Sequence, residues 1–127
     1  MCGISGFADL QSNNQIILQM LNTMKRRGPD ANGYAVFNRC TLLHSRLSII
    51  DPDGGKQPME LHWGNETYTI TYNGELYNTL EVKSALIALG HNFKTNSDTE
   101  VILHAYAQWA EHCVDHFNGI FAFAVWE

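Results

Sequence analysis

The chain has 127 residues, a length that suits one domain, and 45% of them are hydrophobic while 17% are charged. This balance is typical of a globular protein with an apolar core. The net charge of -5 is scattered along the sequence, and no basic stripe with interleaved aromatic residues occurs. Nucleic acid is therefore not expected as a partner, and a small substrate or a protein partner is favoured.

Neither a membrane-spanning segment nor a signal peptide is expected. The longest uninterrupted apolar run, residues 120–126, is much shorter than the roughly 20 residues that cross a bilayer. The three cysteines, Cys2, Cys40 and Cys113, are widely spaced and form no CxxC pair, which argues against a disulfide framework and against a zinc ribbon. We expect a cytoplasmic protein with free thiols.

The first half of the chain predicts three strands and one helix. Residues 3–9 are short and apolar, as in a strand, and residues 16–24 carry apolar side chains at helical spacing. Gly28 and Pro29 predict the end of this helix, with the glycine as a left-handed stop. Strands are then expected over residues 33–38 and 41–50, the second followed by a turn.

The second half predicts two strands and two longer helices. Residues 67–72 are β-branched and aromatic, as in a strand. A helix over residues 80–89 would be stopped by Gly90, and Ser97 and Glu100 have the spacing of a capping box at the start of a third helix. A short helical piece over residues 113–117 and a buried strand over residues 120–126 complete the order.

Cys2 is the leading candidate for a catalytic residue. Removal of Met1 would leave a thiol and a free α-amine on the same residue. A thiol has an ordinary pKa near 8.5, whereas an α-amine titrates at about 7.7 to 8.0 and can accept the thiol proton. Most cysteines are only small buried hydrophobes, but position 2 makes a self-sufficient nucleophile chemically reasonable.

The pair Asn73-Gly74 allows two interpretations. Between apolar segments this dipeptide is typical of a type I′ hairpin turn. An asparagine amide beside a backbone N–H that glycine leaves open could also hold the oxyanion of an acyl-transfer reaction.

Two charged residues are candidates for binding the ends of an amino acid. Arg46 interrupts an apolar strand, so it would snorkel, pair with an acid such as Asp51, or hold a substrate carboxylate. Asp98 lies in the first turn of a predicted helix, where the helix dipole favours a carboxylate whatever its function. The same position would let Asp98 receive a substrate ammonium group.

A metal site is a remote alternative. His112 and His116 are spaced to share one face of a helix, with Cys113 beside them. No third and fourth ligand follows at a recognisable spacing, so an exposed amphipathic face is the simpler interpretation. We expect no metal.

Seven segments in series resemble one known family, the class II glutamine amidotransferase domain of glutamine-dependent asparagine synthetases. The order and spacing agree over essentially the whole chain. The segments are MCGI at 1–4, RGPD at 27–30, HSRLSIID at 44–51, QPM at 57–59, YNGELYN at 72–78, SDTEVIL at 97–103 and FNGIFAFAVWE at 117–127.

The resemblance implies an α+β fold, the N-terminal nucleophile (Ntn) hydrolase sandwich, with four layers in the order αββα and two mostly antiparallel sheets. It implies that Cys2 attacks the side-chain amide of L-glutamine, that Asn73 and Gly74 form the oxyanion hole, and that Arg46 holds the glutamine carboxylate. Asp98 and Glu75 would hold the ammonium group. The pocket would be lined by Leu47, Ser48, Ile49 and Ile50.

The resemblance also implies parts that lie outside residues 1–127. In the family further strands complete the domain, and an ATP-dependent synthetase domain with its own phosphate loop follows. We therefore expect residues 1–127 to be a single, partial glutaminase domain without a cofactor of its own, with ATP and magnesium bound only by the synthetase domain. Ammonia would pass to that domain, in cis or in trans, for the amidation of aspartate.

Two other functions stay open at this point. The chain could be a catalytically silent domain that binds glutamine or serves assembly. It could also be another N-terminal-cysteine hydrolase, such as an acylase. A homodimer is compatible with the sequence, which does not specify an oligomeric state.

Overall fold

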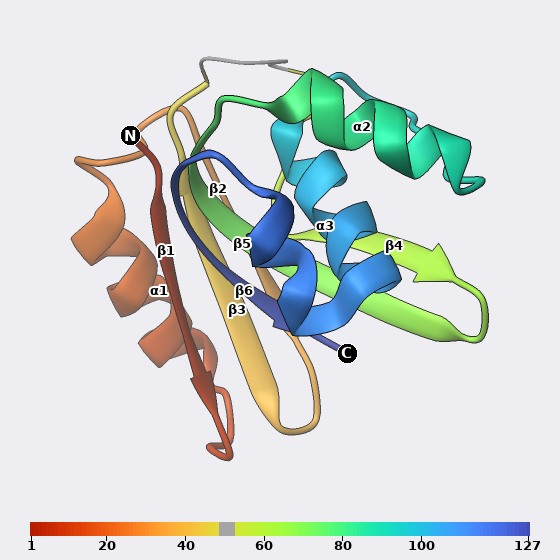
Figure 1. Ribbon diagram of the computed structural model, residues 1–127. Helices are drawn as coiled ribbons and strands as arrows, with labels where there is room; N and C mark the ends of the chain where they lie inside the picture. The colour runs from red at the N-terminus through yellow and green to blue at the C-terminus, as the bar shows by residue number, and fades with distance from the viewer. Residues whose placement is uncertain (49–52) are drawn as a thin grey trace.

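Two three-stranded antiparallel sheets form the centre of the molecule, in a computed structural model that describes residues 1–48 and 53–127 (Figure 1). The first sheet has the order β1-β3-β2 and the second the order β4-β5-β6. The first contains β1 (Gly3–Ala8), β2 (Ala31–Val36) and β3 (Cys40–Arg46). The second contains β4 (Met59–Trp63), β5 (Glu66–Leu76) and β6 (Gly119–Trp126). The helices are α1 (Asn14–Met24), α2 (Thr79–Ala88), α3 (Asp98–Trp109) and the 3₁₀ helix η1 (Ala110–His116).

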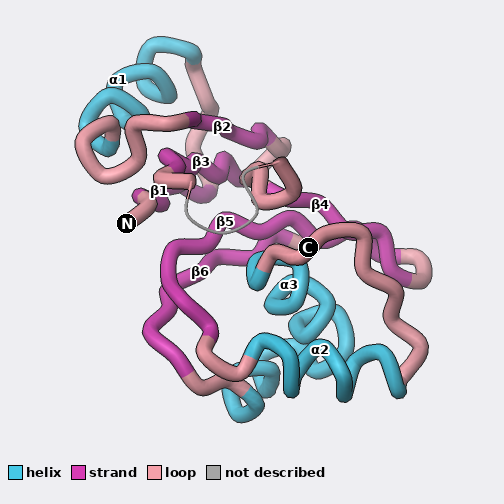
Figure 2. Tube along the Cα trace, turned by 90° about the horizontal axis from the view of Figure 1, so that it is seen from above, coloured by secondary structure: helices cyan, strands magenta, loops and turns pink. Residues whose placement is uncertain are grey.

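The elements stack in four layers. Helix α1 packs on β1 and β3, these two strands contact β5 across the interface between the sheets, and α3 packs on β4 and β5. Helix α2 lies against α3, so both helices are on the same outer side of the second sheet (Figure 2). The predicted α+β sandwich with the layer order αββα is confirmed.

Strand β3 is buried along its whole length because it is covered on both faces. On one face Leu43 joins Ile17, Leu21 and Met24 in a small core beneath α1. On the other face His44 Nε2 lies 3.0 Å from the carbonyl oxygen of Tyr72 in the second sheet. Burial lowers the pKa of His44 to about 4, so the neutral ring can donate this hydrogen bond and link the two sheets.

The larger core lies between the second sheet and the helices α2 and α3. Among its fully buried side chains are Ile70, Leu86, Ile102 and Leu103. Burial of this apolar surface is the main contribution to folding in this half of the molecule. None of the described helices is long and apolar enough to cross a membrane.

The start of α3 agrees only in part with the predicted capping box. The Ser97 side chain accepts a hydrogen bond from the backbone N–H of Thr99 at 3.1 Å, as an N-cap should. The prediction for Glu100 is wrong, because its carboxylate accepts from the backbone N–H groups of Lys94 and Thr95 at 2.8 and 2.7 Å. Glu100 therefore fixes the loop before the helix.

The two predicted glycine stops have different outcomes. Gly90 has φ +98 and follows α2, as predicted. Gly28 is not among the glycines with positive φ, so the prediction of a left-handed stop is wrong. A Cβ at Gly28 would lie 2.1 Å from the carbonyl carbon of Ser45. Close contact with the backbone of β3 is therefore the reason for glycine there.

Two strand predictions need correction. Strand β4 was not predicted, although its five residues, MELHW, alternate apolar and polar side chains as a half-buried strand does. The hairpin interpretation of Asn73-Gly74 is wrong, because β5 continues through both residues to Leu76. Asn73 pairs with Ala122 and Gly74 with Phe121, both in β6. Helices α2, α3 and η1 separate β5 from this partner strand along the chain, so local sequence could not predict the pairing.

Candidate active site

The Cys2 thiol lies at the start of β1, half-buried against the residue that follows β3. Its Sγ lies 3.3 Å from the backbone nitrogen of Leu47, which donates a hydrogen bond to it, and 3.6 Å from the Leu47 carbonyl oxygen. The Arg27 Nε donates to the Cys2 carbonyl oxygen at 3.1 Å. The thiol and its backbone are therefore held from two sides.

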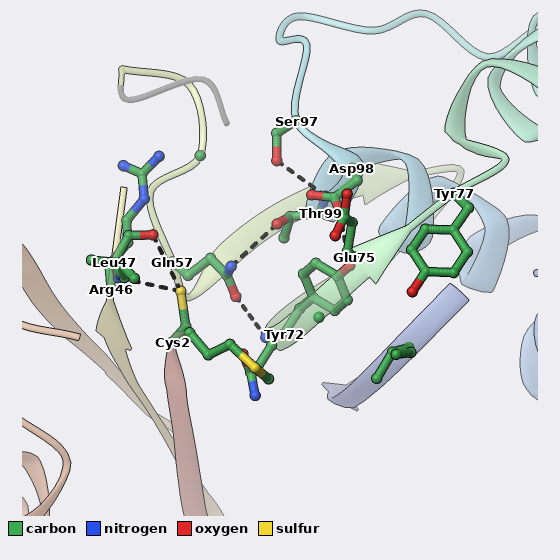
Figure 3. Close-up of a pocket in the computed structure, with 15 residues that line it drawn as sticks. Cys2, Arg46, Leu47, Gln57, Tyr72, Glu75, Tyr77, Ser97, Asp98 and Thr99 are labelled. Atoms are coloured by element: carbon green, nitrogen blue, oxygen red, sulfur yellow. Dashed lines mark hydrogen bonds between the residues drawn. The ribbon is translucent and has the colours of Figure 1, made fainter. Parts of the chain in front are cut away.

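A pocket of about 310 Å³ opens above this thiol (Figure 3). Seven of the residues that the sequence predicts as catalytic or substrate-binding line it. They are Cys2, Arg46, Leu47, Asn73, Gly74, Glu75 and Asp98. Ser48 is not among the lining residues, and the predicted Ile49 and Ile50 lie outside the described part of the chain. In the view of Figure 3 Arg46 and Asp98 are on opposite sides of Cys2.

The RGPD segment supports the Arg46 side of the pocket. Asp30 donates its backbone N–H to the carbonyl oxygen of Arg46 at 3.0 Å, and its carboxylate accepts from the backbone N–H of Ser48 at 2.8 Å. Gly28 packs directly on the backbone of Ser45 and Arg46. This segment therefore fixes the backbone of residues 45–48, which carries Arg46 and contacts the Cys2 thiol.

Asp98 is oriented by two donors on the other side of the pocket. Its Oδ2 accepts from the Tyr72 hydroxyl at 2.7 Å and from the backbone N–H of Leu76 at 3.4 Å. Burial raises the pKa of Tyr72, and its hydrogen bond to Asp98 raises it further, so the hydroxyl stays protonated and remains a donor. Asp98 is 8% exposed, and a buried carboxylate is well suited to an ion pair with a cation.

The backbone of β5 presents the Gly74 N–H to the pocket. In an antiparallel strand, alternate residues direct their N–H groups to the same edge. The N–H groups of Tyr72 and Leu76 both point away from β6, since they donate to Gln57 and to Asp98. The Gly74 N–H, midway between them, therefore points to the same side. A Cβ at Gly74 would lie 2.3 Å from the Ile120 carbonyl oxygen, so only glycine fits.

The structure also brings residues to the pocket that the sequence analysis did not assign. Tyr72 and Thr99 each stand next to a predicted site residue, and Gln57 belongs to the QPM segment. Their position beside Asn73 and Asp98 was a usable signal for Tyr72 and Thr99. Gln57 gave no such signal, because its contacts with β5 and α3 are made only in the folded chain.

The histidine and cysteine cluster after α3 has no features of a metal site. Cys113 is fully buried, and burial raises the pKa of its thiol to about 11. His112 faces Asp115 at 3.4 Å, and His116 stacks on Trp109. Among residues 1–48 and 53–127, no group of three or more His, Cys, Asp or Glu side chains could hold a metal ion.

Comparison with known proteins places this chain in a family. The sequence matches the family model of the glutamine amidotransferase domain over residues 1–127. The chain belongs to this family. Its fold resembles that of the glutamine phosphoribosylpyrophosphate amidotransferase of Bacillus subtilis, solved with ADP and GMP, with a TM-score of 0.80 at 18% identity over 97% of this chain and 34% of that chain. The glutamine amidotransferase domain therefore has the Ntn-hydrolase fold here.

Its curated relatives include long enzymes. Asparagine synthetase (glutamine-hydrolyzing) 3 of Bacillus subtilis is 48% identical over 131 residues, which cover 100% of this chain and 21% of that protein. Asparagine synthetase (glutamine-hydrolyzing) 2 of Oryza sativa is 40% identical over 129 residues, 98% of this chain and 21% of that protein. The chain thus spans about a fifth of the length of these relatives.

Proposed function

We propose that this amidotransferase domain hydrolyses L-glutamine to L-glutamate and ammonia, with Cys2 as the nucleophile. The observation that carries the proposal is the convergence of a thiol, an arginine and a buried carboxylate on one pocket. An amino acid with a side-chain amide offers a partner to each of these three groups. The names of the asparagine synthetase relatives include glutamine hydrolysis, which supports the same substrate.

The nucleophile requires removal of Met1, which lines the pocket and is 61% exposed, so that a peptidase can reach it. The freed α-amine of Cys2 then takes the thiol proton, and the sulfur forms a bond to the side-chain amide carbon of glutamine. The carbon–nitrogen bond breaks, and ammonia leaves with the proton from the amine. Water attacks the resulting thioester, which restores the thiol and releases glutamate.

The negative charge of the tetrahedral intermediate would be held by Asn73 and Gly74. A donor that points at the developing oxyanion is worth roughly 10²- to 10³-fold in rate. The Asn73 side-chain amide and the Gly74 N–H are suitable donors, because both residues line the pocket that holds the thiol.

The two charged ends of glutamine would be held by Arg46 and by Asp98 with Glu75. Leu47, which lines the pocket, would contribute backbone groups. Anchoring the head group in this way sets the depth at which the amide meets the thiol. Asparagine is one methylene shorter, and a displacement of about 1 Å can cost on the order of 10²-fold in rate.

The ammonia would be used by a separate ATP-dependent domain. The relatives are named asparagine synthetases and are about five times as long as this chain. We propose that a synthetase domain, in cis or in trans, accepts the ammonia and amidates aspartate. ATP and magnesium would bind there, and the present chain would need no cofactor.

The test is release of ammonia and glutamate in equal amounts from glutamine by protein whose intact mass shows that Met1 has been removed. Hydroxylamine should divert the thioester to γ-glutamyl hydroxamate. Cys2→Ala should abolish both products, whereas Cys40→Ala, a matched change at a buried thiol in β3, should not. Saturable glutamine binding without ammonia release would instead support a silent binding domain.

A further inference from the structure

Gln57 occupies the place where β4 separates from β5. The two strands pair from Trp63 opposite Glu66 to Met59 opposite Ile70. Two residues before Met59, the Gln57 side chain takes over the role of the strand: its Oε1 accepts the Tyr72 backbone N–H at 2.6 Å. A side chain thus replaces the next backbone hydrogen bond of the ladder, and the edge of β5 beyond it is left open to the pocket.

The other end of the Gln57 amide reaches α3. Its Nε2 donates to the Thr99 hydroxyl oxygen at 3.2 Å, and Thr99 directly follows Asp98. The Asp98 carboxylate accepts a hydrogen bond from the Leu76 N–H, which connects α3 to β5 again. These bonds close a ring that runs from Gln57 to Tyr72, along β5 to Leu76, and back through α3.

Gly74 lies inside this ring. The N–H groups on the open edge of β5 belong to residues 72, 74 and 76, of which the first donates to Gln57 and the third to Asp98. The Gly74 N–H is held between two fixed neighbours in the strand. Such fixed donors stabilise an oxyanion best, because they need no reorganisation when charge develops.

We infer that Gln57 is a positioning residue that sets the Asn73-Gly74 oxyanion donors relative to the Asp98 anchor of the substrate. This inference rests on the proposed glutaminase function and extends it to Gln57, which that proposal does not include. Gln57 keeps both hydrogen bonds through one planar amide, so the distance between strand and helix is fixed by a single rigid group. The side-chain amide of Gln57 makes its hydrogen bonds to Tyr72 and Thr99.

Gln57→Met tests the inference because it keeps the shape of the side chain and removes both hydrogen bonds. We expect kcat for glutamine to fall about 10- to 100-fold, the range for misplaced donors. The rate of Cys2 alkylation by iodoacetamide, which needs no oxyanion donor, should stay within about twofold. Gln19→Met, on the exposed side of α1, is the matched control and should alter neither rate.

Thr99→Val leaves the hydrogen bond between Gln57 and the Tyr72 N–H in place and removes only the hydrogen bond from Gln57 to α3. It should raise KM for glutamine more than it lowers kcat, and Thr99→Ser, which retains a hydroxyl, should be less affected. An unchanged kcat in Gln57→Met, or a parallel fall of kcat and alkylation rate, would overturn the inference.

Amide hydrogen exchange provides a test of the Gln57 hydrogen bonds that does not depend on enzyme turnover. In Gln57→Met the Tyr72 amide should exchange about tenfold faster or more, with amides in the α3 core unchanged. If the Tyr72 amide exchanged at the same rate as in the unsubstituted protein, the ring of hydrogen bonds through Gln57 would be refuted. If the unsubstituted protein released no ammonia, the proposed function would fail. The exchange measurement would still decide whether Gln57 holds the backbone of β5 at Tyr72.

Discussion

At the scale of single residues, the pocket depends on side chains that are themselves held by others. Asp98 is held by the Tyr72 hydroxyl and the Leu76 N–H, and both donors contact Oδ2. Cys2 is held by Leu47 and Arg27. Such support keeps a site within the small tolerance that catalysis allows.

Tyr72→Phe should weaken glutamine binding by removing one donor to Asp98. A hydrogen bond to a charged group contributes about 1.5 to 3 kcal/mol, so we expect KM to rise roughly tenfold or more, with a smaller effect on kcat. Steady-state kinetics check this. Tyr34→Phe, an exposed tyrosine in β2, is the control, and equal KM values in the two variants would contradict the assignment.

Arg46→Lys tests the carboxylate anchor without removing its positive charge. The ammonium of lysine lacks the planar fork of donors that fits a carboxylate. We expect KM for glutamine to rise about tenfold or more, while Cys2 alkylation stays nearly constant. Arg39→Lys, at an exposed position paired with Asp9, should change neither value. If Arg46→Lys left KM unchanged, another residue would have to hold the carboxylate.

At the scale of elements, short connecting segments place the site residues by close backbone contact. The RGPD turn lies against the end of β3, where Gly28 touches Ser45 and Arg46. The QPM segment leads into β4 and holds β5 through Gln57. These segments have few apolar residues, so their role is to fix strands that carry the site.

Gly28→Ala should destabilise the protein more than Gly64→Ala. A Cβ at Gly28 would overlap the Ser45 backbone at 2.1 Å, and overpacking typically costs about 1 to 3 kcal/mol. Gly64 has φ +62, and a Cβ added there would meet nothing within 4 Å, so only the cost of a left-handed alanine, about 1 kcal/mol, is expected. Urea unfolding checks the order, and equal losses would contradict it.

Periodic patterns predicted most helices and strands, because each pattern reports which face is buried. The helix that follows Ser97 is an example, and the end of α2 was predicted from Gly90. Strand β6 lies where a strand was predicted, but the prediction that it is buried is wrong, because Ile120, Ala122 and Ala124 are exposed and none of its residues is buried. Asn73-Gly74 was ambiguous, since the same dipeptide suits a turn and a strand that pairs with a distant partner. Asp98 and Arg46 were suggested by their type and position, whereas the bonds of Gln57 depend on tertiary structure alone.

At the scale of the whole molecule, polar side chains connect the layers. His44 joins the two sheets through the Tyr72 carbonyl. His104 in α3 is 2% exposed and contacts His91 at 2.8 Å between the two Nδ1 atoms, with Glu100 Oε1 3.7 Å from its Nε2. Burial, with a smaller effect of His91, lowers the pKa of His104 to about 4.

Stability should therefore fall as the pH decreases below about 6.5, the pKa of an unfolded histidine. The folded pKa of His44 and of His104 is about 4, so the unfolded state binds more protons between these values. Each histidine can contribute a slope of up to about 1.4 kcal/mol per pH unit. Urea unfolding at pH 7 and pH 5 measures the difference, which His104→Gln should reduce and His62→Gln, at an exposed site, should not.

Cys2 as the glutamine nucleophile is tested by the site at which the protein reacts with an electrophilic analogue of glutamine. The protein without Met1 is incubated with the analogue, and the adduct is located by mass spectrometry of its peptides. We expect one adduct, on Cys2, which forms more slowly when glutamine is present. An adduct on Cys40 or Cys113, or labelling of Cys2 that glutamine does not slow, would contradict this role of Cys2.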